Sequence, residues 1–114
     1  MSKNTEASNI TPKTLLPGAI NDWEMYLTDQ GRSQNTLKAF LSDVRLLTSF
    51  IAPDRAIGAI TTEELNKFFE WMEKERDIPC SPKTLSRRIT SVKSFFRWLH
   101  QYGIIAPDPA EKVL

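Results

Sequence analysis

The sequence contains few of the residues from which metal sites and histidine-dependent active sites are built. Cys80 is the only cysteine and His100 the only histidine among the 114 residues. A single cysteine excludes an internal disulfide, and one cysteine with one histidine leaves too few ligands for an ordinary zinc site. No group of acid, base and nucleophile emerges from the other residues. We therefore predict no catalytic residue, no metal site and no cofactor in this chain, which we do not expect to be an enzyme.

Long apolar runs are absent as well. No run of about eighteen apolar residues occurs, so the sequence predicts no helix that spans a membrane. The N-terminus, MSKNTEASNITPKT, lacks the apolar centre of a secretory signal peptide. We expect a cytoplasmic protein with no membrane partner. Residues 1–15 are rich in polar side chains, which predicts a disordered lead-in.

The formal net charge of +1 conceals an uneven distribution of charge along the chain. Residues 63–77 contain six acidic and three basic side chains, whereas residues 82–103 contain five basic and no acidic side chains. Segregated charge of this kind bears more directly on binding partners than the total charge does.

Apolar side chains recur at helical spacing in four segments of the chain. The predicted helices cover about 17–30, 33–51, 61–77 and 82–102. No stretch alternates between polar and apolar residues with period two, so we expect no strands. Four helices joined by short loops predict a compact all-α bundle.

Helix-capping residues support three of these boundaries. Ser33 and Ser81 are suitable N-cap residues, and Pro82 suits the first helical position. Thr61 and Glu64 have the spacing of a capping box.

The last predicted helix carries a row of cations and hydroxyls opposite its apolar stripe. The row consists of Lys83, Arg87, Thr90, Ser94 and Arg97, and Arg88 and Lys93 lie beside it. Solvated helix faces usually mix both signs of charge, because opposite charges four residues apart support a helix. Two interpretations remain open from the residues alone: an ordinary solvated face, or a face that contacts phosphates and base edges in a DNA groove. The second predicted helix has a weaker version of this face.

Four pieces of the chain together resemble a known family. They are SQNTLKAFLSDVRLLTSFI, AIGAITTEELNKFFEWM, SPKTLSRRITSVKSFFRWLHQYG and APDPAEKVL. Their order and spacing, from about Ala19 to the end, resemble the N-terminal core-binding (SAM-like) domain of tyrosine recombinases, in the phage integrase and Xer-like group. The resemblance implies a SAM-like bundle of four to five helices over 16–106 that clamps one side of double-stranded DNA. The helices at 34–51 and 82–102 would then enter the major groove.

The same resemblance implies which residues contact DNA and what the chain lacks. The implied contacts are Asn35, Thr36, Lys38, Ser42, Arg45, Lys83, Arg87, Arg88, Thr90, Ser91, Ser94 and Arg97. Residues 107–114 would be an exit segment toward a catalytic domain of the same parent protein. No histidine here is followed three residues later by arginine, so we expect the phosphoryl-transfer site to be absent and the isolated domain to be a monomer.

Two further hypotheses compete with DNA clamping. The chain could be a helical module that binds other proteins, with Trp71 and Trp98 as anchors because both project off their apolar stripes. It could also be a helix-turn-helix regulator. The turn at about 77–81 fits that motif poorly, because it contains Pro79, is followed by Pro82 and has no glycine.

Overall fold

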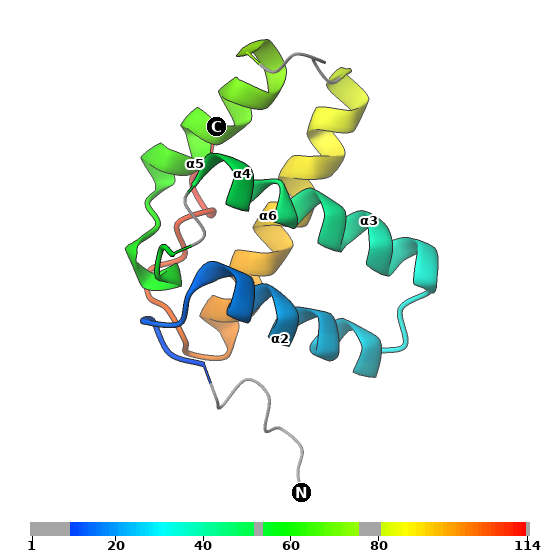
Figure 1. The fold of residues 1–114 in the computed structure, drawn as a ribbon, viewed down its shortest axis with the longest axis vertical. Coiled ribbons are helices and arrows are strands. Elements are labelled where there is room, and N and C mark those ends of the chain that lie inside the picture. Colours follow the sequence, from blue (N-terminus) through cyan, green and yellow to red (C-terminus); the bar gives the residue numbers. More distant parts are fainter. Residues whose placement is uncertain (1–9, 52–53, 76–80, 114) are drawn as a thin grey trace, which may run out of the picture.

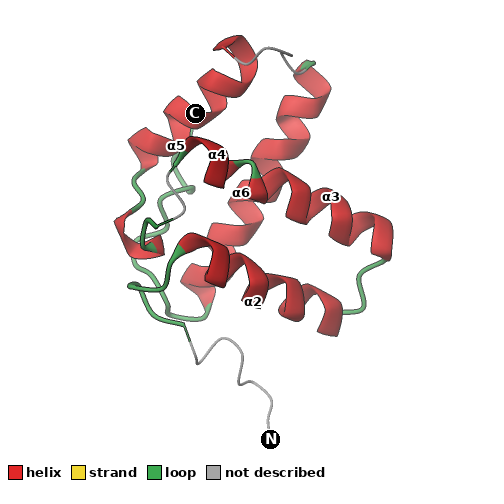
Figure 2. Ribbon diagram, in the orientation of Figure 1, coloured by secondary structure: helices red, strands yellow, loops and turns green. Residues whose placement is uncertain are grey.

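Three helices, α2, α3 and α6, pack together at the centre of the fold, and α5 lies beside them (Figure 1). The computed structural model describes residues 10–51, 54–75 and 81–113. Its elements are α2 (Leu16–Asp29), α3 (Gln34–Arg45), α4 (Leu47–Phe50), the 3-10 turn η1 (Ile57–Ala59), α5 (Thr62–Glu70), the π-helical turn η2 (Trp71–Glu75) and α6 (Pro82–Gln101). Figure 2 shows helices and loops only, and no strand forms among these described residues. The predicted all-α fold is confirmed.

Helix α6 is the longest of the described helices, with 20 residues. Ser81 caps it by accepting a hydrogen bond from the backbone N–H of Thr84, and Gly103, with φ of 74°, follows its last turn. Its buried side includes Phe95 and Phe96. Trp98 is also buried, at 3% exposure, although the helical wheel predicts that it projects off the apolar stripe. Its indole packs against the ring of Tyr26 of α2, with ring centres 5.6 Å apart, and this contact explains the burial.

The helix predicted at 33–51 is divided in two. α3 ends at Arg45 and α4 begins at Leu47. The Thr48 hydroxyl donates to the Arg45 carbonyl at 2.6 Å, and the Ser49 N–H turns to the Leu46 carbonyl at 3.0 Å. A side-chain hydroxyl that donates a hydrogen bond to a backbone carbonyl of the preceding turn often bends a helix.

The helix predicted at 61–77 begins as expected and then changes from α-helical to π-helical geometry. Thr61 and Glu64 form the predicted capping box. After Glu70 the chain makes the π-helical turn η2, which ends the regular α-helix earlier than the sequence predicts. Residues 76–80, which include Cys80 and most of the turn weighed for a helix-turn-helix, lie outside the described residues.

The N-terminal segment is packed where the sequence predicts disorder. Residues 1–9 of the predicted lead-in lie outside the described part, but Ile10 is buried. The Gly58 N–H donates to the Pro12 carbonyl at 2.9 Å, and the Ile57 N–H donates to the Thr14 carbonyl at 2.9 Å. The expected disorder is therefore wrong for residues 10–15, because η1 provides partners for their backbone.

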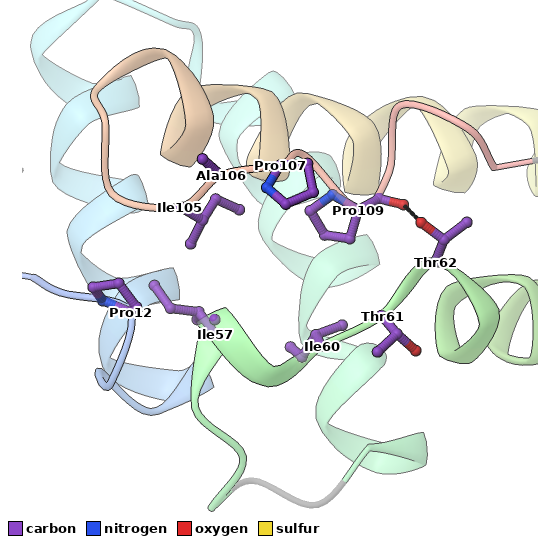
Figure 3. Close-up of a pocket in the computed structure, with 10 residues that line it drawn as sticks. Pro12, Ile57, Ile60, Thr61, Thr62, Ile105, Ala106, Pro107 and Pro109 are labelled. Carbon is purple, nitrogen blue, oxygen red and sulfur yellow. Dashed lines mark hydrogen bonds between the residues drawn. The ribbon is translucent and has the colours of Figure 1, made fainter.

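The C-terminal segment folds back on the same region. Ala110 and Val113 are buried, and the Thr62 hydroxyl donates to the Pro109 carbonyl at 2.5 Å. Between the two ends lies a cavity of about 380 Å³, lined mainly by prolines and isoleucines (Figure 3). The N-terminal segment therefore packs on η1, and the C-terminal segment is joined to the start of α5.

Candidate nucleic-acid interface

The outer side of α3 presents polar and basic side chains. Asn35, Lys38, Ser42 and Arg45 are exposed, as the sequence predicts. Thr36 is half-buried, and its hydroxyl accepts a hydrogen bond from the Ser33 cap at 2.9 Å. The structure therefore brings four of the five predicted α3 residues to the surface and uses the fifth in the helix cap.

The cations of α3 are weakly neutralised. Arg45 lies 3.3 Å from Glu24 of α2, and both side chains are about half exposed. Exposed pairs of this kind contribute little and are screened by salt. Lys38 has no ion pair among the described residues. This side of α3 therefore keeps most of its positive charge available to an external anion.

The row of residues predicted on α6 is divided by the packing. Lys83, Thr90 and Arg97 are exposed, and Lys93 and Ser94 are half-buried. We call Lys83, Thr90, Lys93 and Arg97 the α6 ridge. The Thr90 hydroxyl donates to the Ser86 carbonyl at 3.1 Å, which leaves its oxygen free to accept.

The other three predicted residues of α6 turn toward α3. They surround Asp43, which is 1% exposed. Arg87 binds this carboxylate with two hydrogen bonds, from Nε to Oδ2 at 3.0 Å and from Nη2 to Oδ1 at 2.6 Å. The Ser91 hydroxyl donates to Oδ2 at 2.8 Å, and Arg88 Nε lies 3.7 Å from Oδ1.

This group, which we call the Asp43 cluster (Asp43, Arg87, Arg88 and Ser91), ties the two helices together. Buried charges are tolerated when they are paired and hydrogen-bonded, and the carboxylate meets both conditions. The hydrogen bond to Asp43 raises the pKa of the Arg87 guanidinium above its ordinary value. Ser91 has no exposed surface, so the structure places it in the core and not on the predicted DNA face.

Sequence reasoning missed Asp43, although a signal was present. It is the only acidic residue in 33–51. Asp43 is three positions after Phe40 and four before Leu47, and residues at these spacings share one face of a helix. It therefore lies on the apolar face of its helix. A lone carboxylate at such a position needs a basic partner from another element.

The α6 ridge differs electrostatically from α5. On α5 and η2, Lys67 lies 3.5 Å from Glu63 and Lys74 lies 3.8 Å from Glu70. Within the described residues, no cation of the α6 ridge makes an ion pair. Asp108 and Glu111 share a hollow with Lys93 and Arg97, but no ion pair with either is formed. The ridge therefore carries uncompensated positive charge.

A second hollow joins the ridge to the start of α3. Ser94 and Arg97 line it together with Arg32 and Phe40. The Arg32 guanidinium lies 5.9 Å from the centre of the Phe40 ring. Arg32, which is not among the predicted DNA contacts, thus extends the basic surface from α6 to α3.

The anchors of the protein-interaction hypothesis are largely used inside the fold. Trp98 is buried, and Trp71 packs on Phe50 and Phe68 with ring centres 5.4 and 6.1 Å apart. Neither indole stands free on the surface as an anchor would. That hypothesis therefore loses the two residues on which it depended.

Other kinds of site find little support in the described part of the chain. No cluster of three histidine, cysteine, aspartate or glutamate side chains there could hold a metal ion. None of the helices described is both long and apolar enough to cross a bilayer. The cavity in Figure 3 is polar only through Thr61, Thr62 and backbone atoms.

Comparisons with known proteins identify the family of the chain. The family model for the phage integrase N-terminal SAM-like domain matches residues 20–103. Tyrosine recombinase XerC of Mycobacterium sp. (strain JLS) is 29% identical over 102 residues, which are 86% of this chain and 33% of the relative. Tyrosine recombinase XerC of Mycobacterium tuberculosis (strain ATCC 25177 / H37Ra) is 34% identical over 97 residues, 82% of this chain and 31% of the relative. The chain thus spans about a third of the length of these curated relatives, and no solved structure matches it.

Proposed function

The chain belongs to the family of phage integrase N-terminal SAM-like domains, and from this premise we propose that it binds duplex DNA as the N-terminal clamp of a tyrosine site-specific recombinase. In this proposal α3 and α6 lie in or along the major groove. The chain contributes binding and no catalysis. Its partner on the other side of the DNA is the catalytic domain of the same parent protein, and the isolated chain is a monomer.

The observation that carries the proposal is the uncompensated charge of the α6 ridge. Lys83, Lys93 and Arg97 make no ion pair among the described residues, whereas the two lysines of α5 and η2 each lie within 4 Å of a carboxylate of their own helical segment. Cations that are free in the unbound protein can replace the counterions of DNA phosphates without first breaking an internal pair. An anionic polymer is therefore the ligand that fits this surface.

The exposed and half-buried residues of α3 and α6 divide into two roles. Lys38, Arg45 and Lys83 are suited to phosphates, where charge matters more than direction. Arg97, Asn35 and Ser42 can reach base edges, and so can Thr90 and Ser94. We leave Ser91 out of the interface because it is buried.

The test is the affinity of the whole chain for a fluorescent duplex at several salt concentrations. We expect dissociation constants of about 10⁻⁴–10⁻⁶ M near physiological salt for non-specific duplex. The double variant Lys83→Ala/Arg97→Ala should bind about tenfold or more weakly, and its log–log salt slope should flatten by about two.

A matched control separates site from net charge. Lys67→Ala/Lys74→Ala removes the same charge from α5 and η2, and should leave DNA affinity nearly unchanged. Circular dichroism and thermal melting establish that both double variants are folded. Equal losses in the two variants would mean that only total charge matters, and no binding by the unaltered chain at low salt would refute the proposal.

A further inference from the structure

Arg87 is half exposed although it is bound to a buried carboxylate. Its side chain keeps 52% of its exposure, whereas that of Asp43 keeps 1%. The guanidinium therefore lies at the edge of the Asp43 cluster, with one side toward the core and the other toward solvent. This position distinguishes Arg87 from Arg88, whose side chain is 18% exposed.

The two hydrogen bonds to Asp43 use one particular edge of the guanidinium. They come from Nε and Nη2, and they leave both N–H bonds of Nη1 and the second N–H bond of Nη2 available. The edge between Nη1 and Nη2 carries two parallel donors. That geometry matches a pair of acceptors, such as O6 and N7 of guanine or two oxygens of one phosphate.

The carboxylate is itself held from several directions. Ser91 donates to the oxygen that also receives Arg87 Nε, and Arg88 lies near the other oxygen. Ser91 and Asp43 are both buried, so neither can turn toward solvent. An arginine fixed through two bonds to such a carboxylate gives up less side-chain freedom on binding than a free arginine does.

We propose that Asp43 is a positioning residue for DNA recognition, which holds Arg87 so that its Nη1–Nη2 edge meets a paired acceptor on the duplex. This inference rests on the proposed function, since it assigns a specific donor within the same interface. Asp43 itself touches no DNA. It acts through Arg87.

Asp43→Asn tests the inference because two accounts predict opposite signs. The substitution keeps the size of the side chain and raises the net charge by one. If charge alone governs binding, DNA affinity should rise. If Asp43 positions Arg87, affinity should fall about fivefold or more, because the amide accepts through one oxygen only and holds the guanidinium less firmly.

Arg87→Lys provides a second test that does not depend on the stability of the Asp43 variant. It conserves charge and can still pair with Asp43, but an ammonium has no second edge of parallel donors. We expect weaker DNA binding with thermal stability close to that of the unaltered chain. Unchanged affinity would overturn the inference.

The double variant Asp43→Asn/Arg87→Lys establishes whether the two residues act together. If Asp43 acts through Arg87, the double variant should bind DNA no more weakly than Arg87→Lys alone. Losses that simply multiply would contradict the inference. If Asp43 has only a structural role, its replacement should reduce folding, which circular dichroism measures, and should leave the specific effect of Arg87 on DNA binding unchanged.

Two arms identify the acceptor. Selection from a pool of duplexes with randomised base pairs should enrich guanine at one position with the unaltered chain, and Arg87→Lys should abolish that enrichment if the acceptor is a base. If the acceptor is a phosphate, Arg87→Lys should weaken binding to all duplexes by the same factor. Failure of the unaltered chain to bind any duplex would refute the proposed function, whereas binding that Asp43→Asn strengthens would refute this inference alone.

Discussion

Replacement of Asp43 by alanine should lower the free energy of unfolding by about 3 kcal/mol. Loss of one partner of a buried ion pair typically costs about 3–5 kcal/mol, because the remaining charge stays uncompensated. The lower end applies here, since Arg87 is 52% exposed and can be rehydrated. The remaining cost falls on Ser91 and Arg88. Ser91 is fully buried, and the loss of its hydrogen-bond acceptor costs about 1–3 kcal/mol. Arg88 loses its nearest anion.

Urea denaturation followed by circular dichroism measures this change directly. For a chain of this size, about 3 kcal/mol corresponds to a fall in melting temperature of about 10–15 °C. The matched control is Glu24→Ala, which removes one partner of the exposed pair with Arg45 and should cost about 0–1 kcal/mol. A cost for Asp43→Ala below about 1 kcal/mol, or equal to that of the control, would refute the view that the Asp43 cluster ties α3 to α6.

Three further predictions concern α5, η1 and α2. The hydrogen bond from Arg55 lowers the pKa of Glu64. The Glu64 carboxylate should therefore contribute its full stabilisation above its pKa in the unfolded chain, about 4.3. This stabilisation should be lost as the pH falls through the lower pKa of Glu64 in the folded chain. The melting temperatures of the unaltered chain and of Glu64→Gln should differ at pH 7 and approach each other as the pH falls below about 4.3. Gly58→Ala should cost about 1–3 kcal/mol, because a Cβ atom there would lie 2.7 Å from Pro12 Cβ. Gly18→Ala, whose Cβ would meet its nearest atom at 3.6 Å inside α2, should be neutral or stabilising by up to about 1 kcal/mol in the same melting assay.

Each of these predictions has a clear contrary result. A difference between the unaltered chain and Glu64→Gln that stays constant from pH 7 to pH 3 would show that ionisation of Glu64 does not contribute. Equal effects of the two glycine substitutions would show that the N-terminal segment is not packed tightly on η1.

Local signals in the sequence predicted the helix starts correctly. Ser33, Ser81 and the pair Thr61 and Glu64 cap their helices as their spacing indicates. Each cap depends on residues three positions apart, so the information lies within one turn of the chain. The bend at Leu46 was not predicted, because it depends on which carbonyl the Thr48 hydroxyl takes.

Contacts between distant segments could not be predicted in the same way. Asp43 and Ser91 are 48 positions apart, and only the crossing of α3 and α6 brings them together. A helical wheel gives the apolar side of α6, but it does not show which part of the polar arc a neighbouring helix covers. For this reason Ser91 and Trp98 were expected at the surface and are buried, whereas Lys83 and Arg97 are exposed as expected.

The most direct test of the DNA-binding proposal is an NMR titration of the isotope-labelled chain with a duplex at low and moderate salt. We predict shifts in backbone amide signals of residues 34–45 and 83–97, with little change in α5, and a weaker effect as the salt concentration rises. The absence of shifts at low salt would contradict the account. Shifts centred on α5 or on the cavity between the terminal segments would do so too, because the basic faces of α3 and α6 would then be ordinary solvated surfaces.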